Sequence, residues 1–261
     1  MSQVFHFRGY DIPIDLLENT GGGPETFEAI SDNHLILLQQ YIGIKETDSV
    51  MEIGCGIGRD AIPLTELLGR GRYIGTDTIG PSIQWCQKNI SERFPNFSFV
   101  HHDINDTLHN PTGTLRAFDI RLPADEGSVD LIILQSVFTH MFHDEIIHYM
   151  KEFSRVLKPG GKVWTTVFII DEGILANIRD NAKTQHALSF KHQYGPGCNI
   201  NTRDEPRGAV AFEEEKLKMM IAAGGLELAA PILWGAWSGQ REEPKCGQDG
   251  LILRKKSSDQ G

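Results

Sequence analysis

The sequence predicts an α/β fold in which seven strands form a doubly wound, mostly parallel sheet. A short apolar run at residues 50–53 leads into a glycine-rich turn and then into a segment whose apolar residues group on one side. A second run, Val129–Leu134, is almost uniformly apolar, as expected of a strand buried on both faces of a parallel sheet. A third run, at 163–170, follows a helical pattern and the break Pro159-Gly160-Gly161, where proline stops a helix and the glycines make a turn.

The glycine-rich turn comprises Gly54, Gly56 and Gly58, with Glu52 two residues ahead of the first glycine. A strand, a tight turn and a helix in this order leave backbone N–H groups free at a helix start, and glycines let a ligand approach them closely. The spacing is not that of a dinucleotide-binding turn, because Arg59 stands where G-x-G-x-x-G requires its third glycine. The phosphate-binding pattern G-x-x-x-x-G-K-[ST] is absent. An ordinary glycine-rich turn without a ligand is the alternative interpretation.

Two aspartates follow the next two predicted strands. Asp77 closes a strand at 73–76, about twenty residues after the glycine turn, which fits one strand–helix–strand unit. Its carboxylate is suited to accepting two hydrogen bonds from a ribose diol, although an aspartate here could also merely cap the next helix. Asp103 follows a strand at 97–101, and the stretch 105–127 after it is long enough to be an inserted surface loop.

Together, the acidic-x-G-x-G-x-G pattern, the two aspartates, the fourth strand and the turn at 155–162 resemble class I S-adenosylmethionine-dependent methyltransferases over residues 49–170. The resemblance implies a Rossmann-like methyltransferase fold and an enzyme that uses S-adenosyl-L-methionine and releases S-adenosyl-L-homocysteine. It also implies that Asp103 contacts the adenine amino group. The residues predicted to bind the cofactor are Glu52, Gly54, Cys55, Gly56, Gly58, Arg59, Asp77, Thr78, Asp103, Ile104 and Gln135.

The predicted domain organisation has four parts. Residues 1–30 form an N-terminal lid of loops and short helices, and 31–256 form the methyltransferase domain. Within it, 171–210 lack a strand–helix pattern and are predicted to be a substrate cap inserted after the fifth strand. Residues 257–261 are predicted to be a frayed tail. The remaining predicted elements are helices at 29–41, 144–157 and 212–223 and strands at 226–234 and 249–253.

The composition argues against a broad electrostatic contact with polyanions. The 261 residues are 40% hydrophobic and 23% charged, with a formal net charge of -10, which disfavours nucleic acid and anionic membranes as partners. The four cysteines form no C-x-x-C pair and indicate reduced thiols rather than a disulfide framework or a zinc site. No signal-peptide pattern or membrane-spanning apolar run is present. We therefore expect a cytoplasmic protein without nucleic-acid or membrane partners. The oligomeric state stays open.

The acceptor is predicted to be a small molecule, with O-methylation of a sugar or secondary metabolite favoured. The fourth strand ends in Leu134-Gln135-Ser136-Val137, not in the Asn/Asp-Pro-Pro-aromatic motif of DNA adenine and cytosine-N4 methylases. Segments at 208–215 and 234–239 resemble bacterial methyltransferases of polysaccharide and natural-product pathways. Two alternatives stay open: a protein side-chain methyltransferase, and a non-catalytic S-adenosylmethionine-binding protein.

His140 and His143 are the predicted catalytic residues. They follow the fourth strand, at the edge of the sheet where ligands of open α/β folds bind, and a neutral imidazole can take the proton of a hydroxyl acceptor. His192 and Tyr194, in the cap, are reserve candidates. A buried structural histidine is the competing interpretation. His140, His143 and Asp144 have no recognised metal-ligand spacing, so no metal site is predicted.

Overall fold

The protein is described from a computed structural model, which covers residues 3–256 except 182–183 and 185–186. The predicted tail at 257–261 lies outside the described residues. The chain divides into two compact units, residues 1–133 and 134–261, and each is described by itself. Among the described residues, no helix is both long and apolar enough to cross a bilayer.

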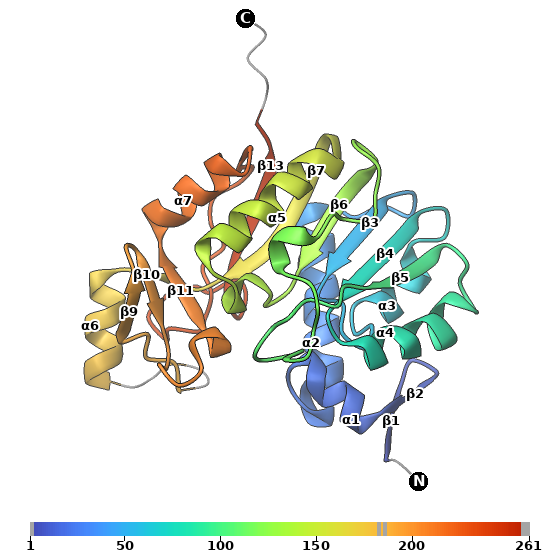
Figure 1. Cartoon of the computed structure of the whole chain (residues 1–261), viewed down its shortest axis with the longest axis horizontal. Coiled ribbons are helices and arrows are strands. Elements are labelled where there is room, and N and C mark those ends of the chain that lie inside the picture. The colour runs from blue at the N-terminus through green and yellow to red at the C-terminus, as the bar shows by residue number, and fades with distance from the viewer. Residues whose placement is uncertain (1–2, 182–183, 185–186, 257–261) are drawn as a thin grey trace, which may run out of the picture. The chain divides into compact units, whose positions relative to one another are not determined.

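A seven-stranded sheet forms the core (Figure 1), with the order β12-β13-β7-β6-β3-β4-β5. Strand β3 pairs in parallel with β4 and β6, and β4 pairs in parallel with β5, whereas β13 runs antiparallel to β7 and β12. This arrangement confirms the predicted mostly parallel, Rossmann-like sheet. The strands are β3 (Ser49–Ile53), β4 (Arg72–Asp77), β5 (Phe97–His101), β6 (Val129–Leu134), β7 (Leu157–Val167), β12 (Leu226–Leu228) and β13 (Asp249–Lys255).

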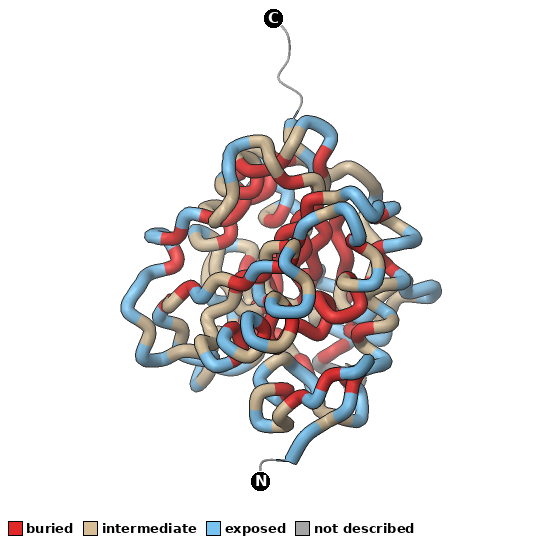
Figure 2. The backbone as a smooth tube through the Cα atoms, turned by 90° about the vertical axis from the view of Figure 1, so that its right-hand side faces the viewer, coloured by how far each residue is buried: buried red, intermediate tan, exposed pale blue. Residues whose placement is uncertain are grey.

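The centre of this sheet is buried, as its uniformly apolar strands require. Every residue of β3 and all but one of β6 are buried, and Figure 2 shows buried stretches of the backbone in red. Helix α3 (Ala61–Leu67) follows β3, and α4 (Gly80–Cys86) with its continuation η3 (Gln87–Ser91) follows β4. These helices supply the crossovers that parallel strands need.

Residues 1–30 contain more regular structure than predicted. Strands β1 (Val4–Phe7) and β2 (Tyr10–Pro13) form an antiparallel hairpin. Its two-residue loop, Arg8-Gly9, has positive φ at both positions (45° and 79°), the pattern of a type I′ hairpin turn. The sequence prediction missed this hairpin because arginine is not a usual residue for the first position. The chain continues through α1 (Ile14–Leu17), η1 (Glu18–Thr20), α2 (Pro24–Leu37) and η2 (Leu38–Ile42).

The stretch between β5 and β6 is a loop, as predicted. It contains one 3₁₀ turn, η4 (Ala117–Asp119), and is held by isolated bridges that pair Ile104 with Leu115 and Asp106 with Asn110. The first bridge ties the loop back to the end of β5.

In the second unit, several predicted boundaries are wrong. Helix α5 (His143–Val156) is followed immediately by β7, so Pro159, Gly160 and Gly161 lie inside a long strand rather than in a turn before it. The last helix, α7 (Glu214–Ala223), is preceded by a strand and does not begin at Phe212. Strand β12 ends at Leu228 instead of continuing to residue 234.

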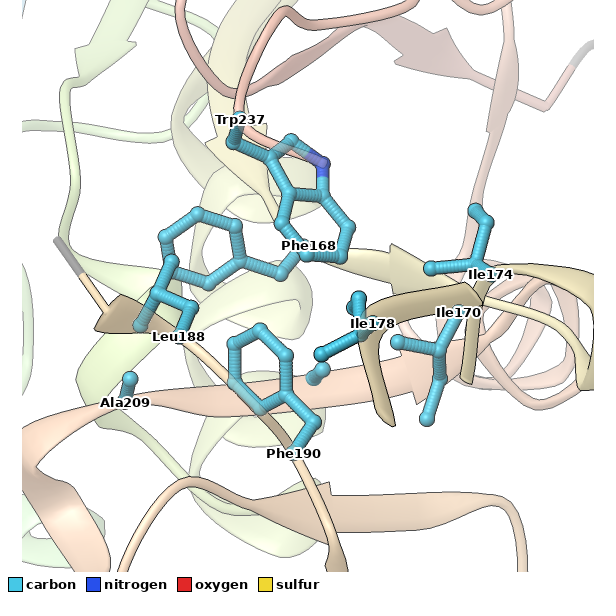
Figure 3. Packing of buried hydrophobic residues seen from close by; sticks show 9 residues of the cluster. Phe168, Ile170, Ile174, Ile178, Leu188, Phe190, Ala209 and Trp237 are labelled. Carbon is cyan, nitrogen blue, oxygen red and sulfur yellow. The ribbon is translucent and has the colours of Figure 1, made fainter. Parts of the chain in front are cut away.

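Residues 171–210 do contain helix and strand, which corrects the expectation of an irregular cap. A second sheet has the order β8-β11-β10-β9, and β9 lies at its edge. Its core is aromatic: the rings of Phe168, Phe190 and Trp237 lie 5.2–5.4 Å apart, centroid to centroid (Figure 3). The elements are β8 (Ile169–Ile170), α6 (Glu172–Asn181), β9 (His192–Gly195), β10 (Cys198–Ile200), η7 (Pro206–Gly208) and β11 (Val210–Glu213).

Asp249, at the start of β13, joins the two sheets within this unit. Its buried carboxylate accepts hydrogen bonds from the backbone N–H of Ile169 and of Gly235 and from the indole of Trp237, at 2.7–2.9 Å. Three donors compensate the burial of this charge. Asp249 therefore positions the loop after β12 against β8.

Candidate active site

The glycine turn in the first unit requires glycine for backbone geometry and for space. Gly54, Gly56 and Gly58 all have positive φ (74°, 52° and 83°), a region that residues with a Cβ rarely adopt. A Cβ at Gly56 would lie 2.5 Å from the hydroxyl oxygen of Thr20. The N–H of Gly54 donates to the carbonyl of Thr76 at 2.8 Å, which holds the turn against the end of β4.

Asp77 connects this turn to the end of β4. Its Oδ2 accepts a hydrogen bond from the N–H of Gly56 (2.7 Å), and its Oδ1 accepts one from the N–H of Ile79 (2.8 Å). Burial raises the pKa of the Asp77 carboxyl, and the same N–H donors partly offset that rise. Each oxygen has a further lone pair, so the carboxylate can still accept from a ribose diol. The hydrogen bond from Gly56 therefore fixes the glycine turn against Asp77.

Glu52 lies deeper, under the turn. It is buried and accepts a hydrogen bond from the hydroxyl of Tyr73. Burial, followed by the negative charge of Asp60, raises the pKa of Glu52 well above its usual range. One carboxylate oxygen is thus committed to the core, and the predicted cofactor contact of Glu52 stays a prediction.

The N-terminal segment holds the outer side of the glycine turn. The hydroxyl of Thr20 accepts from the N–H of Ile57 (3.1 Å), and the guanidinium of Arg59 donates to the carbonyl of Gly21 (2.7 Å). The hydroxyl of Ser31 donates to the carbonyl of Arg59 (2.8 Å). Arg59 therefore binds the N-terminal segment. Sequence reasoning missed Thr20 and Ser31, because hydroxyl residues this far from the motif carry no local signal.

His34 adds an ion pair to the same contact. Its Nδ1 lies 2.9 Å from the carboxylate of Asp60, which is at the start of α3. Burial alone would raise the pKa of Asp60, but His34 and the charge of Arg59 together lower it. The ionised carboxylate is thus stabilised where α2 meets the glycine turn.

Asp103 faces the loop that follows β5. Its carboxylate accepts from the amide of Asn110 (3.0 Å) and from the hydroxyl and N–H of Thr114 (2.7 and 3.2 Å). The Asn110 and Thr114 side chains lower the pKa of Asp103. Asp103 thus anchors the loop, and its adenine contact stays a prediction. The other predicted cofactor residues of this unit are Cys55, which is buried, Thr78, whose carbonyl lies 3.0 Å from His101 Nε2, and Ile104, which is bridged to Leu115.

In the second unit, the residues after β6 are held in a strained conformation. Ser136 has φ of 59°, which is unfavourable for a residue with a side chain. Its N–H donates to the hydroxyl of Thr166 (2.8 Å), and its hydroxyl accepts from the amide of Gln248 (2.8 Å). Gln248 also accepts from Thr166 (2.6 Å), which closes a ring of three hydrogen bonds. Beside this ring, the buried amide nitrogen of Gln135 has no partner in the described part of the chain.

The two predicted catalytic histidines have different environments. His140 Nδ1 lies 2.8 Å from the carbonyl oxygen of Arg207, so this nitrogen carries the proton and donates. His143 Nδ1 lies 2.6 Å from the carboxylate of Asp144 on the exposed start of α5. No three His, Cys, Asp or Glu side chains in the described ranges are grouped so that they could hold a metal ion.

The cap candidate Tyr194 lies in a stack of planar groups that we call the Tyr194 column, composed of Arg207, Phe142 and Tyr194. The rings of Phe142 and Tyr194 are stacked with centroids 4.5 Å apart and planes at 14°. The guanidinium carbon of Arg207 lies over the Phe142 ring at 4.9 Å. His192, the other cap candidate, accepts from Arg203 Nε at 3.3 Å through its own Nδ1.

Glu145 fixes the inner end of the Tyr194 column. Its carboxylate accepts two hydrogen bonds from the Arg207 guanidinium (2.9 and 2.8 Å) and one from the N–H of Phe142 (3.0 Å). One acidic side chain thus orders both the cation and the first ring. No sequence motif links these positions, which come from α5, β9 and η7.

Comparison with known proteins shows what this chain is similar to. The family described as "Methyltransferase domain" matches residues 50–161. The human tRNA N(3)-cytidine methyltransferase METTL2B is 27% identical over 197 residues, 74% of this chain and 45% of that protein. A phthiotriol/phenolphthiotriol dimycocerosates methyltransferase of Mycobacterium tuberculosis is 28% identical over 151 residues, 58% of this chain and 47% of that protein. The chain spans about half the length of these curated relatives.

A solved structure shares the fold. The 1,6-didemethyltoxoflavin-N1-methyltransferase of Burkholderia thailandensis has a TM-score of 0.56 at 17% sequence identity, covering 89% of this chain and 81% of that one. That structure contains bound S-adenosylhomocysteine.

Two predictions about the substrate are wrong. The expectation of a small-molecule acceptor, with O-methylation favoured, is overturned by the tRNA N(3)-cytidine methyltransferases, whose similarity extends over more of the chain than that of the mycobacterial enzyme. The same relatives overturn the expectation of no nucleic-acid partner, which depended on the net charge and on the absence of a DNA-methylase motif after the fourth strand. The predictions of a methyltransferase and of S-adenosyl-L-methionine as its cofactor are confirmed, because residues 50–161 match a methyltransferase domain.

Proposed function

We propose that this protein methylates the N3 ring nitrogen of a cytidine in RNA, with tRNA as the substrate class. The observation that carries the proposal is the extent of the similarity to the tRNA N(3)-cytidine methyltransferases. The 197 aligned residues are more than the matched domain at 50–161 contains, so the likeness continues beyond the cofactor-binding part. A match confined to the cofactor-binding part would have carried no information about the acceptor.

The chemistry of this acceptor differs from that of a hydroxyl. The N3 atom of neutral cytosine carries a lone pair and no proton, so it attacks the methyl carbon directly. The new N–C bond forms as the S–C bond breaks, the sulfur keeps the bonding electron pair, and the positive charge passes to the base. The protein mainly has to align nitrogen, methyl carbon and sulfur. No proton is removed at N3, so the proposed reaction gives His140 and His143 no proton to accept.

In this proposal, the two units have separate tasks. The glycine turn and Asp77 bind the cofactor, supported by their mutual hydrogen bond and by the backbone freedom of the glycines. The hydrogen-bonded ring around Ser136 orders the residues after β6, where Gln135 has a buried and unpartnered amide. An amide of this kind can bind the edge of a base, because it offers both a donor and an acceptor.

We further propose the cytoplasm as the compartment. The cysteines Cys55, Cys86, Cys198 and Cys246 are free, three of them buried, as is common under reducing conditions.

The test is methyl transfer from S-adenosylmethionine labelled in its methyl group to unmodified tRNA transcripts. We expect label in the RNA fraction that ribonuclease releases. At a cofactor concentration that does not saturate the wild type, Asp77→Asn should transfer much less label, because it weakens the cofactor site. DNA of the same sequence serves as the control acceptor. Absence of label from RNA, in a protein that binds S-adenosylhomocysteine normally, contradicts the proposal.

A further inference from the structure

Tyr194 is placed unusually for a residue of a small sheet. Strand β9 is an edge strand, and its pairing with β10 skips one residue: Gln193 pairs with Asn199, and Gly195 pairs with Cys198. Tyr194 is therefore the extra residue of a bulge. Bulges of this kind re-aim a side chain and are frequent beside active sites.

The Tyr194 ring is stacked on Phe142 and is still largely exposed. Tyr194 is 53% exposed although its ring lies parallel to that of Phe142. The guanidinium carbon of Arg207 also lies over the Phe142 ring, 4.9 Å from its centroid, so Phe142 contacts both the cation and the Tyr194 ring. In the Tyr194 column, Arg207 is therefore held by Glu145, and the Tyr194 ring is exposed to solvent.

A cationic group contacts the same strand. His192 precedes Tyr194 by two residues, about 7 Å along the strand, and binds Arg203 through its Nδ1. Arg203 is exposed. An exposed aromatic side chain and an exposed guanidinium that contacts the same strand fit a single-stranded nucleic acid, whose bases stack and whose phosphates attract arginine.

We propose that the exposed face of Tyr194 binds an unpaired nucleobase of the RNA substrate by stacking, while Arg203 contacts the adjoining phosphate. This subsite rests on the proposed RNA methyltransferase function and adds a binding residue to it. The stack is independent of base identity, because every base has a flat π face. Tyr194 thereby contributes to RNA affinity and not to the methyl-transfer step.

The experiment measures binding of a fluorescein-labelled single-stranded RNA by anisotropy, and the KM and kcat for tRNA transcripts, in three variants. Tyr194→Leu keeps an apolar contact with Phe142 but removes the flat ring. It should weaken RNA binding and raise KM by about tenfold, with kcat unchanged. Tyr194→Phe should behave as the wild type within about twofold, because the hydroxyl is not used. The melting temperature and the affinity for S-adenosylhomocysteine should not change in either variant.

Phe118→Leu is the matched control, because Phe118 is 48% exposed and lies in the other unit. Wild-type RNA affinity in Tyr194→Leu overturns the subsite, as does an equal loss in Phe118→Leu. If the protein binds RNA through Tyr194 but transfers no methyl group to it, the proposed function fails and the subsite stands. If it methylates RNA and Tyr194→Leu has no effect, the function stands and the subsite fails.

Discussion

The glycine turn of the first unit and the Tyr194 column of the second are fixed in opposite ways. The turn is held by backbone groups: Gly54 donates to Thr76, and Gly56 donates to Asp77. The column is held by side chains, with Glu145 binding Arg207 and the rings stacking beyond it. A turn held by backbone groups needs glycines at a fixed spacing, so it can be recognised in the sequence. Contacts between side chains can join residues from anywhere in the chain and have no such signal.

This difference predicts that the turn will tolerate substitution far less than the column. Gly56→Ala should have the largest effect, because it adds a Cβ at positive φ and places it against Thr20. We expect a loss of about 2–4 kcal/mol in the free energy of unfolding. Binding of S-adenosylhomocysteine should weaken more than about tenfold. Urea unfolding and calorimetry measure the two effects.

Gly69→Ala is the control for this variant. Gly69 has no heavy atom within 4 Å of an added Cβ and no positive φ. Gly69→Ala should therefore leave the free energy of unfolding and the affinity for S-adenosylhomocysteine unchanged. Wild-type binding in Gly56→Ala would show that the turn is not the cofactor site.

Asp77→Asn tests the connection between the turn and β4. The substitution removes the charge and turns an NH₂ group toward the N–H of either Gly56 or Ile79. We expect calorimetry to show weaker binding of S-adenosylhomocysteine by about 1.5–3 kcal/mol. Asp125→Asn, at an exposed position of the same unit, should bind normally. Equal affinities in the two variants would remove Asp77 from the site.

Substitution of Glu52 is expected to have a smaller effect, on how the free energy of unfolding depends on pH. Because burial raises its pKa, the folded protein keeps a proton on Glu52 that the unfolded chain releases above about pH 4.3. The wild type should therefore lose stability as the pH rises toward the folded-state pKa, by at most about 1.4 kcal/mol per pH unit. Glu52→Gln does not titrate and should gain relative to the wild type over that range. Urea unfolding of both proteins between pH 5 and 7 should show that Glu52→Gln becomes more stable relative to the wild type as the pH rises. A stability difference that does not change with pH would contradict the raised pKa of Glu52.

The smallest effect is expected at the histidines. His143→Ala and His140→Gln should keep kcat within about threefold at saturating RNA and cofactor, since N3 presents no proton, and a catalytic base typically contributes 10²–10⁴-fold. The pH–rate profile should match that of the wild type. A pH-dependent loss of two orders of magnitude in either variant would return that histidine to a base role.

The sequence predicted the sheet and the glycine turn well, for a physical reason, and the roles of the predicted cofactor-binding residues stay predictions. Gly54, Gly56 and Asp77 are required by backbone geometry within one strand–helix–strand unit, so their spacing is itself the signal. The hydrogen bonds of Thr20 and Ser31 to the turn could not be predicted, because they depend on how α2 packs.

The second unit was harder to predict. Its small sheet has short strands, and β9 contains a bulge that interrupts the alternation of side chains. Its core depends on Phe168, Phe190 and Trp237, which are distant in the sequence. Net charge also misled the prediction of partners, because it averages over the whole chain and carries no information about how single charged and aromatic side chains are placed on the surface.

The most direct test of the account is to identify the methylated nucleoside. tRNA transcripts are incubated with the protein and S-adenosylmethionine, digested to nucleosides and analysed by mass spectrometry against 3-methylcytidine, 5-methylcytidine and 2′-O-methylcytidine standards. The expected product is 3-methylcytidine, formed in much smaller amounts by Asp77→Asn when the cofactor does not saturate the wild type. Methyl groups found on the 2′-hydroxyl or on C5 instead would contradict it, because those products require a proton to be removed.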